Sequence, residues 1–335
     1  MTTQTVRLSH GSGKGLQELL STIIIPALIP GGAGVLEDAF VFDIPGRRLA
    51  FTTDSFVVSP LEFPGGNIGT LAACGTINDL SMMGARPMLL SVSLILEEGF
   101  AFEKLTRILT SLSEICTQMG IRIACGDTKV VDKGKADGLF INTSGIGIVT
   151  VGISLSAAYA KPGDAVIVSG GIGLHGVTIL AQRENLHFAS AAESDCAPLW
   201  PLAKAVLDAV PHTRVMRDAT RGGLASVLHE IATDSKVSIV LMESEIPVPQ
   251  VVKGACSFLG MDPLHIANEG RFAIIVPPEW ADKAVAALRS FAIAKDACVI
   301  GQVVEKDRFP VLLKTSIGGT RPVEMPPGEL LPRIC

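Results

Sequence analysis

The last residue, Cys335, carries the side chain with the clearest capacity for covalent chemistry. A thiolate is a nucleophile and can carry a transferred group. The stretch before it predicts a semi-rigid arm without secondary structure, because it is broken by glycine and proline at Gly318, Pro322, Pro326, Pro327 and Pro332. At roughly 3.3 Å per residue the arm reaches tens of ångströms. A frayed end is the ordinary alternative, but the apolar residues at the tip favour an arm that docks: Leu330, Leu331 and Ile334.

Four aspartates with hydroxyl neighbours could handle a metal. Asp54 and Asp127 follow predicted strands, and Asp38 and Asp79 lie near the ends of other elements. Each one alone is more typical of a cap or a turn. As a set they are the oxygen ligands that Mg²⁺ takes beside the phosphates of a nucleotide. Asp79 stands beside Asn78 on an apolar helix, which indicates either an N-cap or surface pair, or buried polar groups with a function.

Two glycine-rich stretches precede predicted helices and so suit anions. The first is His10–Gly15, before an apolar helix over 16–25; it lacks the Walker A spacing, and a flexible lead-in is an equal alternative. The second is 217–223, where Arg217, Asp218 and Arg221 precede a helix over 224–233 and would shape a cleft between domains.

The elements that must position these residues alternate along the whole chain. Period-two and helical patterns predict two α+β halves with β-rich cores and helices on one side, divided near 150–162. The predicted strands are 39–44, 48–53, 86–96, 121–125, 139–149, 164–169, 237–241, 271–276, 297–304 and 310–314. The predicted helices are 68–83, 102–119, 195–210, 224–233, 249–259 and 279–292.

Composition excludes several classes of protein. The 335 residues are 48% hydrophobic with a net charge of −5, and no run of lysine or arginine is present, so we expect no nucleic-acid partner. Polar first residues predict no signal peptide, and the apolar run over 23–36 is too broken for a membrane span. Seven cysteines without a C-x-x-C pair indicate a reducing, cytoplasmic setting.

Taken together, the motifs resemble those of HypE, a family of hydrogenase maturation proteins in the superfamily of aminoimidazole ribonucleotide synthetase and selenophosphate synthetase. The resemblance runs end to end. Its landmarks are HGSGKG at 10–15, TTDSFVV at 52–58, FPGGNIG at 63–69, GTINDL at 75–80, GDTKVV at 126–131, SGGIGLHG at 169–176, RDATRGG at 217–223, ANEGR at 267–271 and the terminal PRIC. The terminal motif is specific to this family, whereas selenophosphate synthetases carry their reactive residue near the N-terminus. Lys14 stands where the family is expected to have glycine, so the backbone geometry of the first loop could differ from that of the family.

The resemblance implies the fold and the reaction. The expected fold is α+β, with a β-rich N-domain that binds ATP and Mg²⁺ and forms a homodimer (1–155), an α+β C-domain (156–316) and a mobile tail (317–335). The expected reaction is the ATP-dependent dehydration of a carbamoyl group, held as a thiocarboxamide on Cys335, to a thiocyanate whose cyanide goes to the iron of a [NiFe]-hydrogenase. The expected partners are HypF-like, HypC-like and HypD-like maturation proteins, with no nucleic acid and no membrane.

The resemblance also assigns roles to residues. Asp38, Asp54, Asp79 and Asp127 would handle metal and phosphate, with Asn67 and Thr128 near them, and His10, Gly11 and Gly13 would lie at the phosphates. Glu269 and Lys129 are the candidates for removing the amide protons. Lys129 could equally bind a phosphate oxygen, Glu269 could cap a helix, and His10 could be a solvated loop residue. Arg333 would seat the tail and favour the Cys335 thiolate.

Two other functions compete with this one. An enzyme of the same superfamily acting on a free small molecule would keep its turnover after Cys335→Ala. A non-catalytic scaffold that only delivers a thiol-bound group would keep its function after Asp54→Ala and Asp127→Ala.

Overall fold

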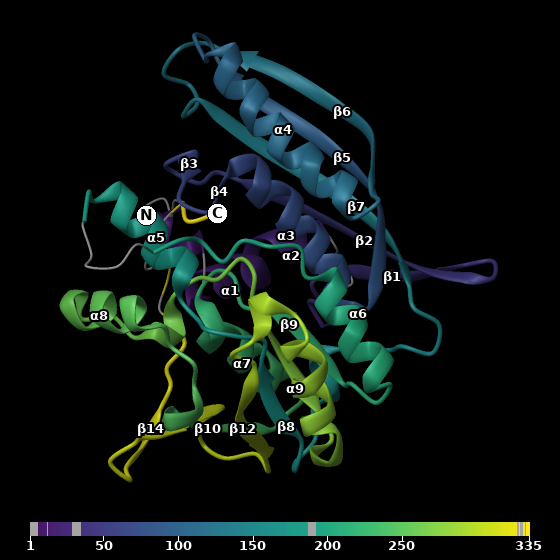
Figure 1. Cartoon of the computed structure of the whole chain (residues 1–335), viewed down its shortest axis with the longest axis vertical. Helices are drawn as coiled ribbons and strands as arrows, with labels where there is room; N and C mark the ends of the chain where they lie inside the picture. Colours follow the sequence, from purple (N-terminus) through teal and green to yellow (C-terminus); the bar gives the residue numbers. More distant parts are fainter. Residues whose placement is uncertain are drawn as a thin grey trace.

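Two β-sheets organise the chain, one in each half. The computed structural model describes residues 6–11, 13–28, 35–186, 192–326, 328, 331 and 333–335. Figure 1 shows the first sheet with its helices above the second, and the C-terminus between the two halves. The first sheet has the order β1 (Phe40–Ile44), β2 (Arg47–Phe56), β7 (Leu139–Val149), β5 (Ala85–Glu97) and β6 (Arg122–Val131).

Within the described residues, helices cover one face of the first sheet and leave the other open. Strand β7 alternates between buried and half-buried residues along its whole length, as expected for a sheet with one packed face. The packed face lies against α3 (Ile68–Met82) and α4 (Phe102–Gln118), and α4 connects the parallel strands β5 and β6. The other face is open, with Phe40, Phe51 and Ile95 exposed by 71%, 42% and 43%. The prediction of helices on one side is therefore right for this half.

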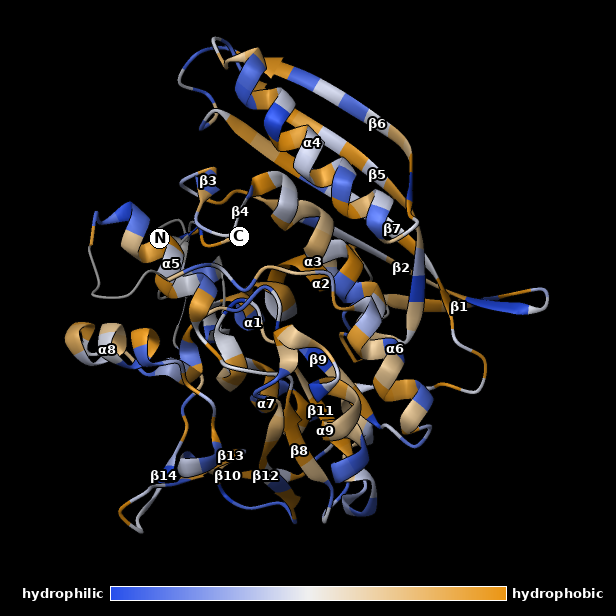
Figure 2. Cartoon of the chain, in the orientation of Figure 1, coloured by the Kyte–Doolittle hydropathy of each residue, from blue (hydrophilic) through white to orange (hydrophobic). Residues whose placement is uncertain are grey.

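The second sheet is covered on both faces, so the same prediction is wrong for the second half. Its order is β14 (Thr320–Pro322), β13 (Val311–Lys314), β10 (Ser238–Met242), β12 (Cys298–Val304), β8 (Ala165–Val168), β11 (Phe272–Val276) and β9 (Val215–Asp218). Strands β8 and β11 are buried throughout and read as continuous apolar runs, which hides the two-faced packing from a period-two search. Figure 2 shows these central strands as mostly hydrophobic.

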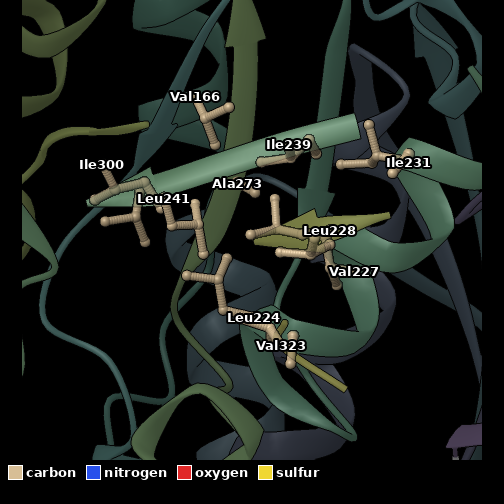
Figure 3. Packing of buried hydrophobic residues seen from close by; sticks show 14 of the residues in the cluster. Val166, Leu224, Val227, Leu228, Ile231, Ile239, Leu241, Ala273, Ile300 and Val323 are labelled. Atoms are coloured by element: carbon tan, nitrogen blue, oxygen red, sulfur yellow. The ribbon is translucent and has the colours of Figure 1, made fainter. Parts of the chain in front are cut away.

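Alternate residues of these strands face different helices. One face packs on α7 (Gly223–Asp234), as Figure 3 shows for Val166, Leu228 and Ala273. The other face packs on α6 (Trp200–Ala209) and α9 (Ala281–Arg289). The remaining helices are α5 (Leu174–Arg183), α8 (Gln250–Leu259), α1 (Gly13–Leu19), a π-helical turn (Leu20–Ile24) and α2 (Ile25–Leu28), and a short hairpin is formed by β3 (Glu62–Phe63) and β4 (Gly66–Asn67).

Helix α3 joins the halves. All but two of its residues are buried, because it packs on its own sheet, on α4, and on α6 and β9 of the second half. Asn78 is 1% exposed and crosses to the second half: its Nδ2 donates to the carbonyls of Ala197 (3.1 Å) and Glu269 (3.2 Å), and its Oδ1 accepts from Leu199 N (2.7 Å). The Asn78–Asp79 pair is therefore not a surface pair, and the halves are fastened at the helix that carries Asp79.

No helix in the described parts of the chain is both long and apolar enough to cross a membrane.

Candidate active site

Three of the four predicted aspartates meet at the junction of the halves, and a fourth acid joins them from the second half. Asp38 precedes β1, Asp54 lies in β2, Asp79 lies in α3, and Asp218 ends β9. Thr52 Oγ1 donates to Asp79 Oδ2 at 2.7 Å, and its distance to the Asp38 carbonyl is 3.1 Å. Asp218 is 7% exposed. Sequence reasoning gave Asp218 no part among the acids, because it read 217–223 as a loop before a helix rather than the end of a strand.

Burial raises the pKa of all four carboxyls, and repulsion from nearby acids adds to the rise for Asp38, Asp79 and Asp218. Burial is the largest cause for each. The pKa of Asp79 is raised well above its ordinary value by burial and then by Asp218, Asp54 and Asp38. The pKa of Asp218 rises from 3.8 to about 6. Buried acids whose ionisation is suppressed by neighbouring carboxylates, as for Asp79, form a site that a cation would stabilise.

Two arginines border these acids. Arg217 Nε lies 3.0 Å from Asp38 Oδ1, and Arg217 Nη2 lies 2.9 Å from Glu230 Oε2. Burial lowers the pKa of Arg217, but the surrounding carboxylates outweigh it and the pKa is raised overall, so the guanidinium stays charged. Arg221 lowers the pKa of Asp54 through its charge. Together they provide cations for phosphate oxygens next to carboxylates for a metal.

A cavity of about 490 Å³ adjoins these arginines. It lies between the N-terminal helices and α7, and its lining includes Gly13, Glu37, Arg217, Arg221 and Ser226. The hydroxyl of Ser226 is buried without a hydrogen-bond partner in the described chain. A larger cavity of about 610 Å³ lies at the other end of the second half, beside Tyr159, Lys161 and Trp280, and none of the predicted site residues lines it.

The N-terminal segment contacts the base of the tail. His10 Nδ1 accepts from Arg7 N at 3.1 Å within a 3₁₀ turn (Leu8–Gly11). Lys14 N donates to the Pro326 carbonyl at 3.1 Å. Gly13 has φ +56°, and a Cβ there would lie 2.2 Å from that carbonyl oxygen, so this close approach requires glycine. Ser12 lies outside the described residues.

The fourth aspartate lies apart. Asp127 is in register with Ser93, Asn142 and Ser55, three strand spacings from β2, or about 14 Å. Side chains alternate between the faces of a strand, so Asp54 faces α3 whereas Asp127 shares the open face with Ser55. Asp127 Oδ2 lies 2.7 Å from Lys129 Nζ, and the two side chains are 61% and 68% exposed. The hydrogen bond from Lys129 lowers the pKa of Asp127.

Asp54 and Asp127 lie inside strands, so the prediction that they follow strands is wrong. The β2–β7 ladder continues to Phe56, and the β5–β6 ladder continues to Val131. Gly126 reads as a turn residue in the sequence. In the structure, a Cβ added at this position would lie 2.4 Å from the Val92 carbonyl oxygen. Glycine therefore permits the close approach of β5.

Asn67 caps α3. Its Oδ1 accepts from Gly69 N (2.8 Å) and Thr70 N (3.1 Å), and its Nδ2 donates to Ser111 Oγ (2.9 Å). These contacts satisfy free N–H groups at the helix start. In this way Asn67 fixes the helix that carries Asp79.

Glu269 is a buried carboxyl beside this junction. It is 3% exposed, and its Oε1 has no hydrogen-bond partner in the described part of the chain. Its pKa is raised well above its ordinary value by burial, then by Cys196, Asp218, Asp195 and Asp54. Glu269 lies in a loop before β11 and caps no helix of the described chain. A buried carboxyl with a raised pKa and a free oxygen is a candidate acid or base.

The tip of the tail docks at the same junction. Val57 N donates to Cys335 O at 3.0 Å, and Ser59 N donates to Arg333 O at 3.2 Å. Ile334 is 2% exposed and packs in the core between the halves, where Cys335 and Cys196 also pack. Residues 57–59 follow β2. The end that bears the thiol is therefore bonded to the segment that comes directly after the strand of Asp54. Figure 1 shows the C-terminus beside β4 and near α3.

Arg333 seats the tail through contacts of its own. Its Nε donates to the Val57 carbonyl at 3.0 Å, and its Nη1 lies 2.5 Å from Asp137 Oδ2. Arg333 has φ +55°, a left-handed conformation that a non-glycine residue keeps only when its surroundings hold it. Pro332 lies outside the described residues.

Comparisons with known proteins identify the family. Models of the N-terminal and C-terminal domains of AIR synthase related proteins match residues 36–149 and 161–314. The carbamoyl dehydratase HypE of Rhizobium leguminosarum bv. viciae is 48% identical over 332 residues, which cover 98% of this chain and 95% of that protein. The chain belongs to the HypE family of carbamoyl dehydratases. The family resemblance, the α+β fold and the enzyme class predicted from the motifs are thereby confirmed.

Solved HypE structures have the same fold. A structure described as a HypE–HypF complex matches with a TM-score of 0.87 at 44% identity, covering 92% of this chain and 99% of that chain. A structure described as HypE in complex with ATP matches with a TM-score of 0.84 at 41% identity, covering 99% of this chain and all of that chain.

The donor set of the HypE junction fits Mg²⁺ only with help from a nucleotide. Among the described residues, no three His, Cys, Asp or Glu side chains are close enough together to hold a metal ion by themselves. Mg²⁺ is commonly bound by one or two carboxylates together with substrate phosphates. Asp38 Oδ2 is buried without a hydrogen-bond partner in the described chain, so a carboxylate oxygen is available to such a cation.

Proposed function

We propose that this HypE protein dehydrates a carbamoyl group carried on its own Cys335, converting a thiocarboxamide to a thiocyanate at the expense of ATP. Its family membership makes it a carbamoyl dehydratase with a role in hydrogenase maturation. The observation that carries the finer proposal is the docked tip: Cys335 O accepts from Val57 N at the junction where Asp54, Asp79, Asp218 and Glu269 gather.

The reaction needs an acceptor for oxygen and acceptors for two protons. The carboxamide oxygen attacks the γ-phosphate of ATP, and the C–O bond then breaks so that the oxygen leaves as phosphate. Both N–H protons are lost as the C≡N bond forms. We assign Glu269 as the base, because its raised pKa makes it a stronger proton acceptor once it is ionised. Lys129 is the second candidate.

We assign the nucleotide to the cavity between the N-terminal helices and α7. Gly13, Arg217 and Arg221 line it, so backbone and guanidinium groups face the space that phosphates would enter. His10 and Gly11 precede this lining on the same segment. One or two of the carboxylates of Asp38, Asp54, Asp79 and Asp218 would hold Mg²⁺ together with phosphate oxygens, and the bound ion would neutralise charge on the transferred phosphoryl group. The ATP complex of a 41% identical HypE supports a nucleotide site in this chain.

We further propose a homodimer whose partner copy completes each site, with the domain limits 1–155, 156–316 and 317–335. The open face of the first sheet exposes Phe40, Phe51 and Ile95 over strands that carry Asp127, Thr128 and Lys129. In one chain these polar residues cannot join Asp54, because the sheet lies between them. A second copy against the open face would bring Asp127 and Lys129 to the partner's tail and phosphates.

Mixing two inactive variants tests this arrangement. Asp54→Asn subunits and Lys129→Met subunits, unfolded and refolded together, would form heterodimers in which one site holds neither change. Roughly a quarter of the parent activity per subunit should return. No return of activity in confirmed heterodimers would place Lys129 in the site of its own chain.

We propose HypF as the carbamoyl donor and HypC-like and HypD-like proteins as carriers of the iron that accepts the cyanide. The HypE–HypF complex of a 44% identical protein supports the first assignment. A cytoplasmic setting suits the cysteines, all seven of which lie in the described residues and outside any disulfide.

Intact mass measurement tests the central proposal. Incubation with a carbamoyl-transferring HypF and then with Mg-ATP should add one carbamoyl group and then remove one water. Both changes should be absent in Cys335→Ala. Turnover of a free small molecule by Cys335→Ala would favour the alternative enzyme of the same superfamily. Delivery that persists in Asp54→Ala would favour the scaffold.

A further inference from the structure

The tail is held in two separate places, and only the second includes the thiol. Near its base, His229 Nε2 bonds the Val323 carbonyl at 2.6 Å and His265 Nε2 bonds the Glu324 carbonyl at 2.9 Å. Strand β14 and the Lys14–Pro326 hydrogen bond hold the same stretch. The nine residues after Pro326 have an extended length of about 30 Å.

Helix α5 supplies two side chains that hold the tip. His175 Nε2 lies 2.8 Å from the Ile334 carbonyl oxygen. Arg183 Nη2 donates to the Arg333 carbonyl at 2.8 Å and to the Ser59 carbonyl at 2.8 Å, so it joins the tip to the N-domain segment on which the tip lies. Both contacts are to main-chain carbonyls, so they can form whichever group the Cys335 sulfur carries.

Contacts outside the tail also hold the ring of His175. It is 0% exposed, its Nδ1 lies 2.7 Å from Ser194 Oγ, and Ser194 Oγ accepts from Cys196 N. Burial lowers the pKa of His175, which keeps the ring neutral. With Ser194 donating to Nδ1, the remaining proton is on Nε2 and points to the Ile334 carbonyl. Phe63 packs edge-on against the ring at 5.5 Å.

We propose that His175 and Arg183 are positioning residues that latch the thiol-bearing tip in the site, and that their strength sets the balance between two steps of the reaction. The inference rests on the proposed function. Loading of the thiol by an external donor requires the tip to leave the junction. The ATP-dependent step requires the tip to be docked. A weaker latch therefore speeds loading and slows dehydration, whereas a misfolded protein is slower in both.

The first test uses neither ATP nor a carbamoyl donor. Cys335 is alkylated with iodoacetamide, and the C-terminal peptide is followed by mass spectrometry. Arg183→Met and His175→Leu should raise the alkylation rate by about tenfold, because each removes a buried hydrogen bond to the tip. His175→Gln, whose side-chain amide can donate in place of Nε2, should lie nearer the parent rate. Arg321→Met is the matched control, since Arg321 pairs with Asp262 (2.6 Å) at the base of the tail.

Equal alkylation rates in the parent and in all latch variants with a parent-like melting temperature would overturn the latch and leave the proposed function standing. The second test measures the two steps separately in Arg183→Met. Faster carbamoyl loading with slower dehydration supports the latch. A parallel fall in both steps with a lowered melting temperature assigns Arg183 a purely structural part and contradicts the proposal. Faster alkylation with no dehydration even in the parent chain would support the latch and remove the proposed function.

Discussion

Asp54 and Asp127 occur in similar local sequence, Thr-Asp-Ser and Gly-Asp-Thr, yet the fold gives them opposite properties. Asp54 faces α3 among other acids, and its pKa is raised by burial. Asp127 is on the open face of the same sheet, and its pKa is lowered by its hydrogen bond with Lys129. Asp54 is therefore enclosed among acids at the junction, whereas Asp127 is exposed beside Lys129. The comparison shows that the face of a strand, rather than the motif, decides what an aspartate can do.

The largest expected effect is on turnover when a buried acid loses its charge. Asp54→Asn should lower ATP-dependent dehydration by about 10³-fold, because it removes one of the few groups available to stabilise the charge of the phosphoryl transfer. ADP release by the carbamoylated protein measures this. Asp43→Asn, a change at an exposed acid of the β1–β2 hairpin, is the control. Full turnover in Asp54→Asn would show that the buried carboxylate is no more important for the reaction than an exposed one.

Glu269→Gln should lower the same rate by about 10²-fold, because a positioned base is lost while the shape of the site is kept. Loading of Cys335 by the donor should be unchanged if, as we propose, the tip leaves the junction for that step. Loading and dehydration are read separately by intact mass. A normal dehydration rate would leave Lys129 as the remaining candidate for the base.

The buried acids should also set the pH dependence of stability. The pKa of Asp218 is raised to about 6 from 3.8 in the unfolded chain, so the folded state holds this proton more tightly. Its contribution to stability is present below pH 4 and is lost as the pH rises through 6. Without Mg-ATP, the melting temperature should fall over this interval.

Asp218→Asn should flatten this profile and raise the melting temperature at pH 8, and Mg-ATP should have a similar effect on the parent chain. Differential scanning calorimetry from pH 5 to pH 8 checks both. Superimposable profiles for the two proteins would show that Asp218 does not cause the pH dependence of stability.

The smallest effect is expected at the exposed pair. In the monomeric chain, Asp127→Asn should change the free energy of unfolding by less than about 1 kcal/mol, because the ion pair with Lys129 is largely solvated there. Urea denaturation measures the change, with Asp54→Asn measured alongside. A loss of several kcal/mol would mean that Asp127 is buried in the folded assembly.

Local patterns sufficed for most of the elements. The helical face of 102–119 and the alternation over 139–149 depend on neighbours in the sequence, and α4 and β7 follow them closely. The predicted ends of elements were wrong where a residue contacts a partner far away in the sequence. Gly126 reads as a turn but accommodates the Val92 carbonyl, and the helix predicted over 195–210 begins only at Trp200. The Asp195 side chain instead accepts from Glu269 N and Gly270 N, both at 3.3 Å.

The sequence by itself determined the family, the α+β class and the groups able to do chemistry, because motifs and periodicity are properties of adjacent residues. It determined that the tail could dock, through its apolar tip. Only the tertiary structure decided which aspartates meet, that Asp218 joins them, and that α5 holds the tip. Burial, repulsion between charges and hydrogen bonds to main-chain carbonyls act between residues that the chain brings together only when both sheets have formed.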